Sequence, residues 1–342
     1  MEGEAVRFGI IGLGLIYRIA HVLAFQEPEK ARAVAVCDLD EGLVAAQAQA
    51  LGARGYHSYS DLLADPDVEA VDIILPHNLH FAVAKAALEA GKHVVIEKPM
   101  TVASQDSLAL ITLAQRLGLR FTVAENTRFI PAYAEVKRLI QAGVIGEPTL
   151  VRTLISGSEI ERLTDSSLWK GRKDGSCGGV IIDGGAHSFY LLKWLIGEVA
   201  SLQALAGKLV PESEVEDWAV VTGRFTTGGL FSVEFTFTSG GPWNERLEVH
   251  GREGLIVSDQ LREPSALYYS HKRDYDGTPL VGAPFAPRTW KYRSIADGIL
   301  DFSAAVRENR PTGVDPMDGW YAVRMVEKAY ESVATGKPAS FD

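Results

Sequence analysis

Short apolar segments alternate with helical patterns through the first third of this chain. Segments rich in β-branched residues run over 6–11, 33–37, 70–75 and 93–96, and a weaker one runs over 120–123. Amphipathic helical patterns lie between them, at 41–51, 81–90 and 102–117. Because each step between parallel strands needs a crossover the size of a helix, this alternation predicts an α/β domain with a parallel sheet over residues 1–128.

The pattern changes after residue 131. A helix expected over 132–142 precedes segments in which apolar and polar residues alternate, at 215–225, 230–238 and 245–250. The turn Thr227-Gly228-Gly229 between two of them is typical of an antiparallel hairpin. We therefore expect a second, α+β domain over 129–342 with a sheet of a different class. A last helix is expected over 316–335, and packing at the domain junction is one possibility for it.

The composition disfavours several classes of protein. The chain has 342 residues, 46% hydrophobic and 23% charged, which is typical of a globular protein with two domains. Its formal net charge of -10 disfavours nucleic acid and anionic membranes as partners. No apolar run approaches the ~18 residues that span a bilayer, and the acidic N-terminus lacks a secretion signal. Cys37 and Cys177 have no metal-ligand spacing, so we expect reduced thiols, no metal site and a cytoplasmic location.

A pair of glycines follows the first predicted strand. Gly12 and Gly14 allow a tight turn and let a pyrophosphate approach backbone amides, among them those of Leu15 and Ile16. Asp38 ends the second strand, where a carboxylate accepts hydrogen bonds from ribose hydroxyls. Strand, glycines, helix and acid together predict a Rossmann-type NAD site. Since no cation beside Asp38 would neutralise a 2′-phosphate, NADP is the less favoured cofactor.

The tripeptide Glu97-Lys98-Pro99 ends the strand expected over 93–96. Ligands of open parallel sheets collect at the carboxyl ends of the strands, so Lys98 is placed to meet cofactor or substrate, and Glu97 is assigned to the cofactor site with it. An ordinary strand-ending turn with a solvated lysine is the alternative interpretation. We expect the Lys98-Pro99 bond to be cis, because X-Pro bonds adopt that form at little cost.

Asp183 and His187 are four residues apart in a segment with helical spacing, so both project from one helix face. Histidine accepts a proton near neutral pH, as the oxidation of a hydroxyl requires. A structural histidine with Asp183 as a helix cap explains the same spacing equally well. Gly184 and Gly185 are unfavourable inside a helix, and we interpret them as making room for a ligand.

Five motifs occur in order along nearly the whole chain: Gly12-Leu13-Gly14, Leu75-Pro76-His77-Asn78-Leu79-His80, residues 91–99, Asn126-Thr127-Arg128-Phe129-Ile130-Pro131 and residues 178–187. Together they resemble the Gfo/Idh/MocA family of oxidoreductases. The resemblance implies an N-terminal Rossmann domain and a C-terminal domain with a large, open, mostly antiparallel sheet. It further implies hydride transfer between NAD and a ring carbinol carbon of a sugar, inositol or sugar derivative. In this scheme His187 is the general base, Asp183 binds a substrate hydroxyl and Lys98 holds the reacting oxygen.

Other site candidates are assigned by position. Four residues that follow predicted strands are expected at the cofactor site: Pro76, Asn78, His80 and Asn126. His80 equally well begins the next helix. Arg128 is a candidate substrate contact, with a structural salt bridge as the alternative. Trp169 is a second substrate candidate, because the loop around it often reaches the substrate in the family, although aromatic residues are more often core. Lys170, Arg172 and Lys173 in the same loop are candidates to bind a phosphate or carboxylate group, with a solvated loop as the favoured interpretation.

Three functional hypotheses remain open. An NAD-dependent dehydrogenase of cyclic polyols or sugars is favoured, followed by a glycoside hydrolase of the same fold that recycles NAD within each turnover. The third is a nonenzymatic NAD-sensing protein. We also expect a homodimer or homotetramer formed through the second sheet, whose exposed face we expect to carry four apolar residues: Val220, Phe231, Val233 and Phe235.

Overall fold

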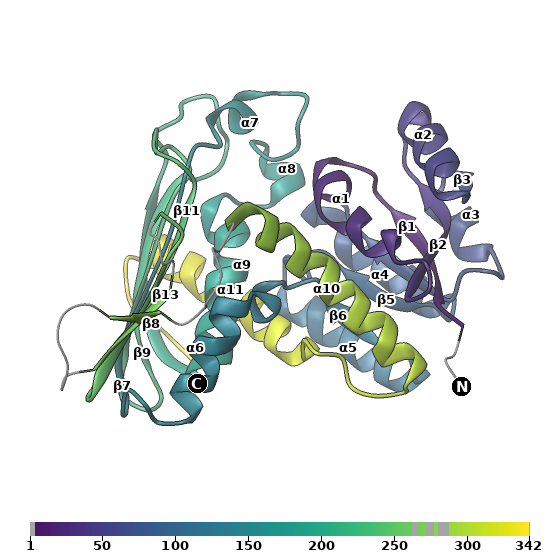
Figure 1. Ribbon diagram of the computed structural model, residues 1–342. Coiled ribbons are helices and arrows are strands. Elements are labelled where there is room, and N and C mark those ends of the chain that lie inside the picture. The colour runs from purple at the N-terminus through teal and green to yellow at the C-terminus, as the bar shows by residue number, and fades with distance from the viewer. Residues whose placement is uncertain (1–3, 262–265, 271–276, 280–286, 342) are drawn as a thin grey trace. The chain divides into compact units, whose positions relative to one another are not determined.

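The computed structural model describes residues 4–261, 266–270, 277–279 and 287–341. The chain divides into two compact units (Figure 1). The first unit comprises Met1–Phe129 and Arg288–Trp320, and the second comprises Ile130–Pro287 and Tyr321–Asp342. The boundary expected from the sequence lies after residue 128, and the first segment of the first unit ends at Phe129. The return of the segment Arg288–Trp320 to the first unit was not expected.

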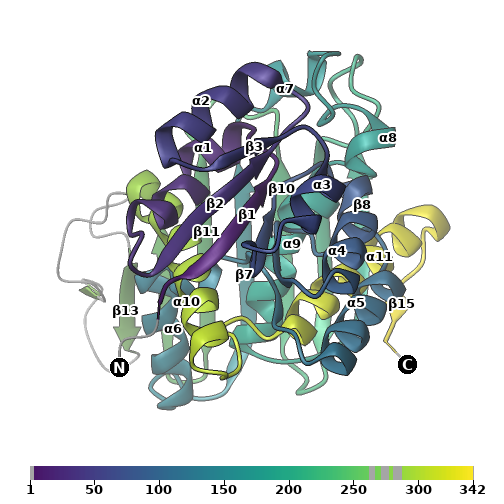
Figure 2. The ribbon, with the colours of Figure 1, turned by 90° about the vertical axis from the view of Figure 1, so that its right-hand side faces the viewer.

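The first unit contains a six-stranded parallel sheet in the order β3-β2-β1-β4-β5-β6. Figure 2 shows β1, β2 and β3 of this sheet. Its strands are β1 Val6–Ile11, β2 Ala31–Cys37, β3 Arg54–Tyr56, β4 Ala70–Ile73, β5 His93–Ile96 and β6 Phe121–Val123. This is the strand order of a dinucleotide-binding Rossmann fold, so the α/β prediction is confirmed. The short strand β3 is an addition that the hydrophobic pattern did not indicate.

Both faces of this sheet are covered, as the alternation along β1 requires. Phe8 packs against Phe25 and Phe302 on one face, with ring centroids 5.5 and 6.1 Å apart. On the other face Gly9 leaves room for the side chain of Leu62, which would lie 2.5 Å from an added Cβ. The helices of this unit are α1 Leu15–Ile19, η1 His21–Gln26, α2 Glu41–Leu51, α3 Tyr59–Ala64, η2 His77–Leu79, α4 His80–Glu89, α5 Ser104–Leu117, η3 Thr127–Phe129 and α10 Pro287–Arg307.

Helix α10 belongs to the first unit because its apolar side complements the core around β1. Ile295, Ala296, Ile299 and Phe302 are all at most 6% exposed and join the same cluster as Phe8. Their spacing of one, three and three residues puts them on one helix face. This amphipathic signal is present in the sequence, and it corrects the assignment of all residues after 128 to the second domain.

The second unit contains a mixed sheet of nine strands among the described residues. The strands, in spatial order, are β14 Thr278–Pro279, β13 Ala266–Ser270, β12 Gly254–Asp259, β11 Asn244–Gly251, β7 Pro148–Ser156, β10 Leu230–Thr236, β9 Trp218–Phe225, β8 Val199–Gly207 and β15 Ala339–Ser340. Only β7 and β10 pair in parallel among these strands. The large, mostly antiparallel sheet and the hairpin at residues 227–229 are therefore confirmed.

One face of this sheet packs against helix α9 Val180–Leu195 (Figure 1). Phe231, Val233 and Phe235 lie on that covered face and are at most 3% exposed. Their assignment to the exposed face was wrong, because alternation separates two faces without showing which one a helix covers. Val220 alone of the four is exposed, at 38%. The other helices with residues in this unit are α6 Pro131–Gln141, α7 Ile160–Thr164, α8 Lys173–Ser176 and α11 Pro316–Thr335, the last of which begins in the first unit.

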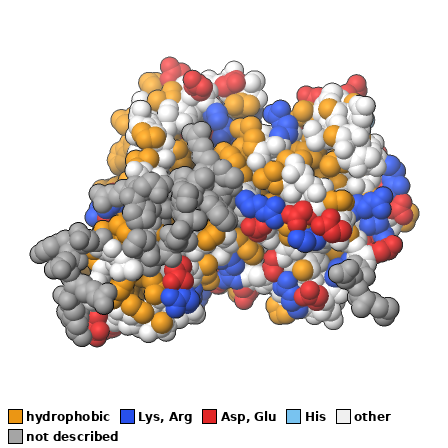
Figure 3. Space-filling model, in the orientation of Figure 1, with side chains coloured by type: hydrophobic (Ala, Val, Ile, Leu, Met, Phe, Trp, Pro, Cys, Tyr) orange, Lys and Arg blue, Asp and Glu red, His pale blue; other side chains and the backbone are white. Residues whose placement is uncertain are grey.

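On the face drawn in Figure 3, acidic and basic side chains lie close together in small groups. Among the described residues, no helix combines the length and the apolar character needed to cross a membrane. Over the same residues, no cluster of three or more His, Cys, Asp or Glu side chains is arranged to hold a metal ion.

Candidate active site

The loop after β1 has the geometry of a phosphate-binding turn. Gly12 has a φ of +99°, and an added Cβ would lie 2.0 Å from the carbonyl oxygen of Ile74. Only glycine fits this position. Gly14 begins α1 with no side-chain cap, and the space around it is open, with no atom within 4 Å of an added Cβ. The amides that follow Gly14, on the half-exposed Leu15 and its neighbour Ile16, are thus suited to a pyrophosphate.

Asp38 stands at the carboxyl end of β2 and is fixed by the glycine loop. Its Oδ2 accepts a hydrogen bond of 2.7 Å from the amide of Leu13, and its Oδ1 accepts one of 3.0 Å from the amide of Asp40. A carboxylate has about four acceptor positions, so this anchoring still allows it to accept ribose hydroxyls. Gly12, Gly14 and Asp38 therefore lie together, as the sequence predicted, and fit a bound dinucleotide.

Lys98 and Glu97 follow β5, next to a buried triad that sequence reasoning missed. The imidazole of His21 bridges two carboxylates, with Nδ1 2.9 Å from Asp72 Oδ2 and Nε2 3.1 Å from Glu97 Oε1. Glu97 Oε2 in turn accepts a hydrogen bond of 2.8 Å from the amide of Lys98. The Lys98-Pro99 bond is cis, as expected. The triad thus ties the backbone of Lys98 to the interior of the sheet.

The two carboxylates keep His21 protonated. Burial alone would lower the pKa of this completely buried imidazole, but the charges and hydrogen bonds of Asp72 and Glu97 outweigh burial and raise the pKa to about 10. A sequence signal did exist, because Asp72 interrupts an otherwise apolar strand. A carboxylate in such a place needs a buried partner.

His80 begins the next helix, as the alternative given for it states, and the cofactor contact expected for it stays a prediction. It is fully buried at the start of α4, with Nδ1 2.7 Å from the carbonyl of Pro99 and Nε2 2.8 Å from that of Leu75. Burial lowers the pKa of His80, and the two carbonyl acceptors oppose that effect. His80 therefore joins the ends of two neighbouring strands. In sequence, Pro76 and Asn78 lie between Leu75 and His80. Pro76 precedes η2, and Asn78 lies within η2 and is exposed.

Asn126 and Arg128 are both tied to the returning segment of the first unit. The amide nitrogen of Asn126 donates to Ser294 Oγ at 2.8 Å, and Arg128 lies 3.7 Å from Asp318 Oδ2. The salt bridge given as the alternative for Arg128 is therefore present. The ligand contacts expected for both residues stay predictions.

Asp183 and His187 lie on α9 in the second unit, one turn apart. The first turn of α9 is held by Glu216, whose carboxylate accepts from the amide of Ile181 at 3.1 Å and from the hydroxyl of Tyr330 at 2.7 Å. The N-cap residue of α9 is Gly179, so Asp183 is not the helix cap that the structural alternative assigned to it, and the roles expected for Asp183 and His187 stay predictions.

The two glycines between Asp183 and His187 make room for protein. A Cβ on Gly184 would lie 2.8 Å from the ring of Phe235, and one on Gly185 would lie 2.8 Å from the ring of Phe189. Their interpretation as space for a ligand was wrong. Gly184 allows α9 to lie close to the sheet, so the position of His187 depends on this packing.

Lys170 is the site residue that sequence reasoning most clearly misjudged. Its ammonium lies 2.9 Å from Asp183 Oδ2 and 2.9 Å from Glu159 Oε2, and its side chain is only 13% exposed. It is therefore an ion-paired neighbour of Asp183 and not a solvated loop residue. Trp169 precedes it in the same loop and is half-buried.

The candidate residues thus form one group in each unit. In the first unit the glycine loop, Asp38 and the turn after β5 occupy carboxyl ends of the parallel strands, where nucleotides bind. In the second unit Asp183, His187 and Lys170 gather around α9.

Comparison with known proteins identifies both units. Residues 6–125 match the profile of the GFO/IDH/MocA oxidoreductase family, NAD-binding Rossmann fold. Residues 133–257 match the profile of the GFO/IDH/MocA C-terminal domain.

Several named relatives are similar over their full length. Levoglucosan dehydrogenase of Pseudarthrobacter phenanthrenivorans is 27% identical, with 97% of each chain covered. Myo-inositol 2-dehydrogenase of Thermotoga maritima is 26% identical, with 96% of each covered. Among solved structures, a levoglucosan dehydrogenase in complex with NADH and levoglucosan has a TM-score of 0.88 at 25% identity, covering 98% of this chain and 99% of that one.

Proposed function

Because the chain belongs to the Gfo/Idh/MocA family of NAD-dependent oxidoreductases, we propose that it oxidises or reduces a ring carbinol carbon of a sugar, an inositol or a sugar derivative. Full-length relatives that act on levoglucosan and inositol support this substrate class. The observation that carries the proposal is the position of Lys98, directly after β5 at the nucleotide-binding edge of the Rossmann sheet.

The first unit would hold the dinucleotide through residues already placed at that edge. The amides after Gly12 and Gly14 suit the pyrophosphate, and the carboxylate of Asp38 suits the adenosine ribose. NAD supplies the hydride acceptor when bound. A carboxylate at position 38 would repel a 2′-phosphate, so NAD should bind more tightly than NADP.

Proton transfer is assigned to the second unit. In the oxidative direction His187 accepts the hydroxyl proton while the carbinol carbon loses a hydride, so the alcohol loses two electrons and two protons in all, one of the protons within the hydride, as it becomes a carbonyl. Lys98 stabilises the negative charge that develops on the oxygen. Asp183 accepts a hydrogen bond from a neighbouring hydroxyl and so orients the ring.

A screen for NADH formation tests the proposal. Inositols, aldoses, uronates and glycosides would be supplied with NAD, and we expect absorbance at the NADH wavelength with at least one cyclic polyol or sugar. Glycoside cleavage without net NADH formation would identify the hydrolase instead. NADH binding without turnover of any member would favour a nucleotide sensor.

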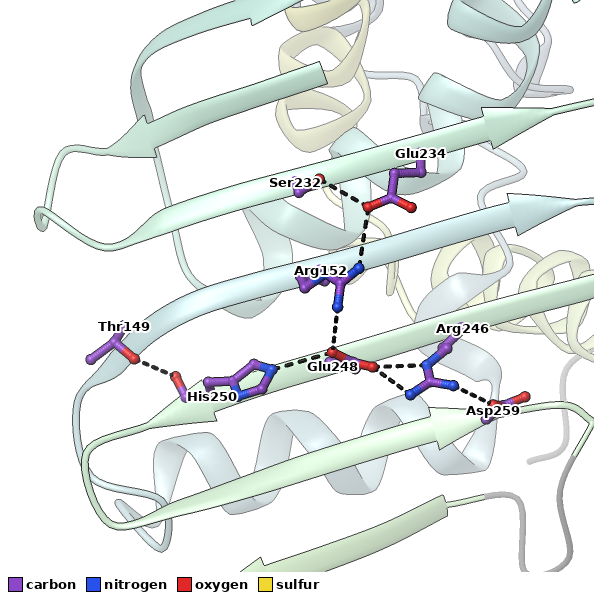
Figure 4. A network of polar contacts seen from close by, with 8 residues as sticks. All are labelled: Thr149, Arg152, Ser232, Glu234, Arg246, Glu248, His250 and Asp259. Atoms are coloured by element: carbon purple, nitrogen blue, oxygen red, sulfur yellow. Dashed lines mark hydrogen bonds and ion pairs between the residues drawn. The ribbon is translucent and has the colours of Figure 1, made fainter. Parts of the chain in front are cut away.

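We further propose that two or four copies associate through the face of the large sheet opposite α9, here called the outer face. It exposes Leu205 and Leu230 at 66% and 49%. Beside them a network joins Arg152, Glu248 and their neighbours (Figure 4). Glu248 is only 8% exposed in a single copy, so association would remove little further water from its carboxylate. A second copy that covered this face would bury its leucines, and the free-energy cost of desolvating its charged groups would be reduced.

We also propose a cytoplasmic location, a reducing compartment. Both cysteines are free, and burial raises the pKa of Cys37 to about 11 and also raises that of Cys177. Recovery of the native protein in a secreted fraction would contradict this location.

A further inference from the structure

The side chains of Glu159, Lys170 and Asp183 form a compact charge cluster in the second unit. Three segments contribute them: the residue before α7, the loop between α7 and α8, and the first turn of α9. The ammonium of Lys170 lies 2.9 Å from a carboxylate oxygen of each partner. The three side chains are 13–17% exposed, so they are largely desolvated but still reach solvent.

The ammonium of Lys170 has its interactions satisfied by protein. It has three N–H groups, and it forms ion pairs with two carboxylates, those of Glu159 and Asp183. On another side it lies 5.1 Å from the ring centroid of Phe237, within the range of a cation–π contact. An anionic substrate group would have to displace one of these carboxylates to reach Lys170.

The two carboxylates of the cluster are acceptors at more than one position. A carboxylate offers about four lone-pair positions, and the pair with Lys170 uses Oδ2 of Asp183. The formal charge of the three side chains is -1. Arg162 adds a positive charge at Glu159 Oε2, 3.0 Å away, but its side chain is 40% exposed and screened by water.

We propose that this cluster makes the site selective for neutral polyols over uronates and phosphorylated sugars, with Lys170 as the positioning residue that holds Asp183 toward a substrate hydroxyl. The inference rests on the proposed function and extends it, because it names the charge of the substrate. Hydroxyls donate to the carboxylates of the cluster, whereas an added anion is repelled by them.

Binding measurements separate this inference from the activity itself. Isothermal titration of the NADH-loaded protein would use matched pairs: D-glucose with D-glucuronate, D-galactose with D-galacturonate, and myo-inositol with myo-inositol 1-phosphate. The wild type should bind the neutral member at least about tenfold more tightly. Equal or tighter binding of the anions would overturn the inference.

Variants then test the residues. Glu159→Gln keeps the shape but frees Lys170 from one carboxylate, so the preference for the neutral member should fall by about tenfold. Lys170→Met should weaken neutral ligands by about tenfold, and Lys170→Arg should restore part of the loss. Arg138→Met is the matched control, because it removes a positive charge of the same unit that pairs with Glu135 on α6 and not with a member of the cluster, and the preference for the neutral member should stay unchanged. A preference that Glu159→Gln leaves unaltered contradicts the inference.

Turnover measured in parallel distinguishes a failure of this inference from a failure of the proposed function. NADH formation with a charge preference that the variants do not change would leave the dehydrogenase and reject the role of Lys170. The stated binding preference without NADH formation would reject the dehydrogenase and leave the cluster as a selective binding site.

Discussion

Lys98 and His187 are the side chains on which the proposed hydride transfer depends most directly. Replacing either by alanine removes a group that acts on the reacting hydroxyl, so turnover should fall by at least about a hundredfold. NADH affinity should stay near that of the wild type, because the glycine loop and Asp38 are untouched. Steady-state kinetics with fluorescence titration of NADH measures both. Near-normal turnover in either variant would remove that residue from the mechanism.

His21 makes the stability of the first unit depend on pH. Its pKa is about 10 in the folded protein, against an ordinary value near 6.5, so the folded state holds its proton more tightly. The resulting stabilisation is complete below about pH 6.5, declines between pH 6.5 and 10, and is lost above pH 10. Urea unfolding across this range should show His21→Asn less stable by a few kcal/mol at pH 6, with the difference from the wild type shrinking as pH rises. A difference independent of pH would contradict a charged His21.

The residues that the sequence predicted correctly depend on local chain geometry. Gly12 must adopt a positive φ directly after a strand, and Asp38 ends the neighbouring strand, so pattern and spacing suffice. The roles of His21 and Lys170 were not predicted, because they depend on partners that the fold brings together. His21 is 51 and 76 residues from its two carboxylates. Only Asp72, a charge inside an apolar strand, gave a sign of this triad.

At the scale of elements, the packing of α9 on its sheet determines where Asp183 and His187 stand. Gly184→Ala would place a Cβ 2.8 Å from Phe235, so we expect a net loss of about 1–2 kcal/mol in the free energy of unfolding. The loss should appear even though alanine is intrinsically favoured in helices by about 1 kcal/mol. Adding Phe235→Leu should recover part of it.

A second helical glycine provides the control for that substitution. In α2 an alanine at Gly42 would meet only Asp40 Oδ1, at 3.2 Å, and should leave stability unchanged or slightly raised. Chemical denaturation of the three variants measures these differences. If Gly184→Ala kept full stability and lost only substrate affinity, the glycine would serve the ligand after all.

Helix α10 shows what hydrophobic pattern can and cannot establish about elements. The spacing of Ile295, Ile299 and Phe302 indicates an amphipathic helix from sequence alone. The pattern does not reveal which core the apolar side will fill, because the helix lies some 290 residues after β1 along the chain. The contact between Phe302 and Phe8 answers that question in the structure.

At the scale of the whole molecule, the chain is built from two units, and neither unit is continuous in sequence. The first unit needs Arg288–Trp320 to complete its core, so a boundary drawn once along the chain divides that core. The sequence predicted one boundary, near residue 128, and the chain first passes from one unit to the other after Phe129. It passes between the units twice more, after Pro287 and after Trp320, and neither passage was predicted. The sequence predicted that the large sheet is mostly antiparallel. Which of its faces is covered could not be predicted, because that depends on where α9 packs.

Association through the outer face gives the prediction that concerns the complete protein. Leu205 and Val220 are cross-strand neighbours there, and Val220 in turn pairs with Glu234. Lys at either position would insert a charge into an apolar contact between copies while leaving a favourable or neutral neighbour within one copy. We expect Leu205→Lys and Val220→Lys to lower the mass measured by light scattering at micromolar concentration to that of one chain.

The matched control is Leu117→Lys, which changes a leucine of the first unit that is 45% exposed and lies outside the large sheet. Its mass should equal that of the wild type, since the substitution adds the same charge away from the outer face. Circular dichroism of all three variants checks that each copy is folded, because a lower mass has meaning only for native chains. A wild-type protein with the mass of one chain, or an unaltered mass in both outer-face variants, would show that association does not use this surface.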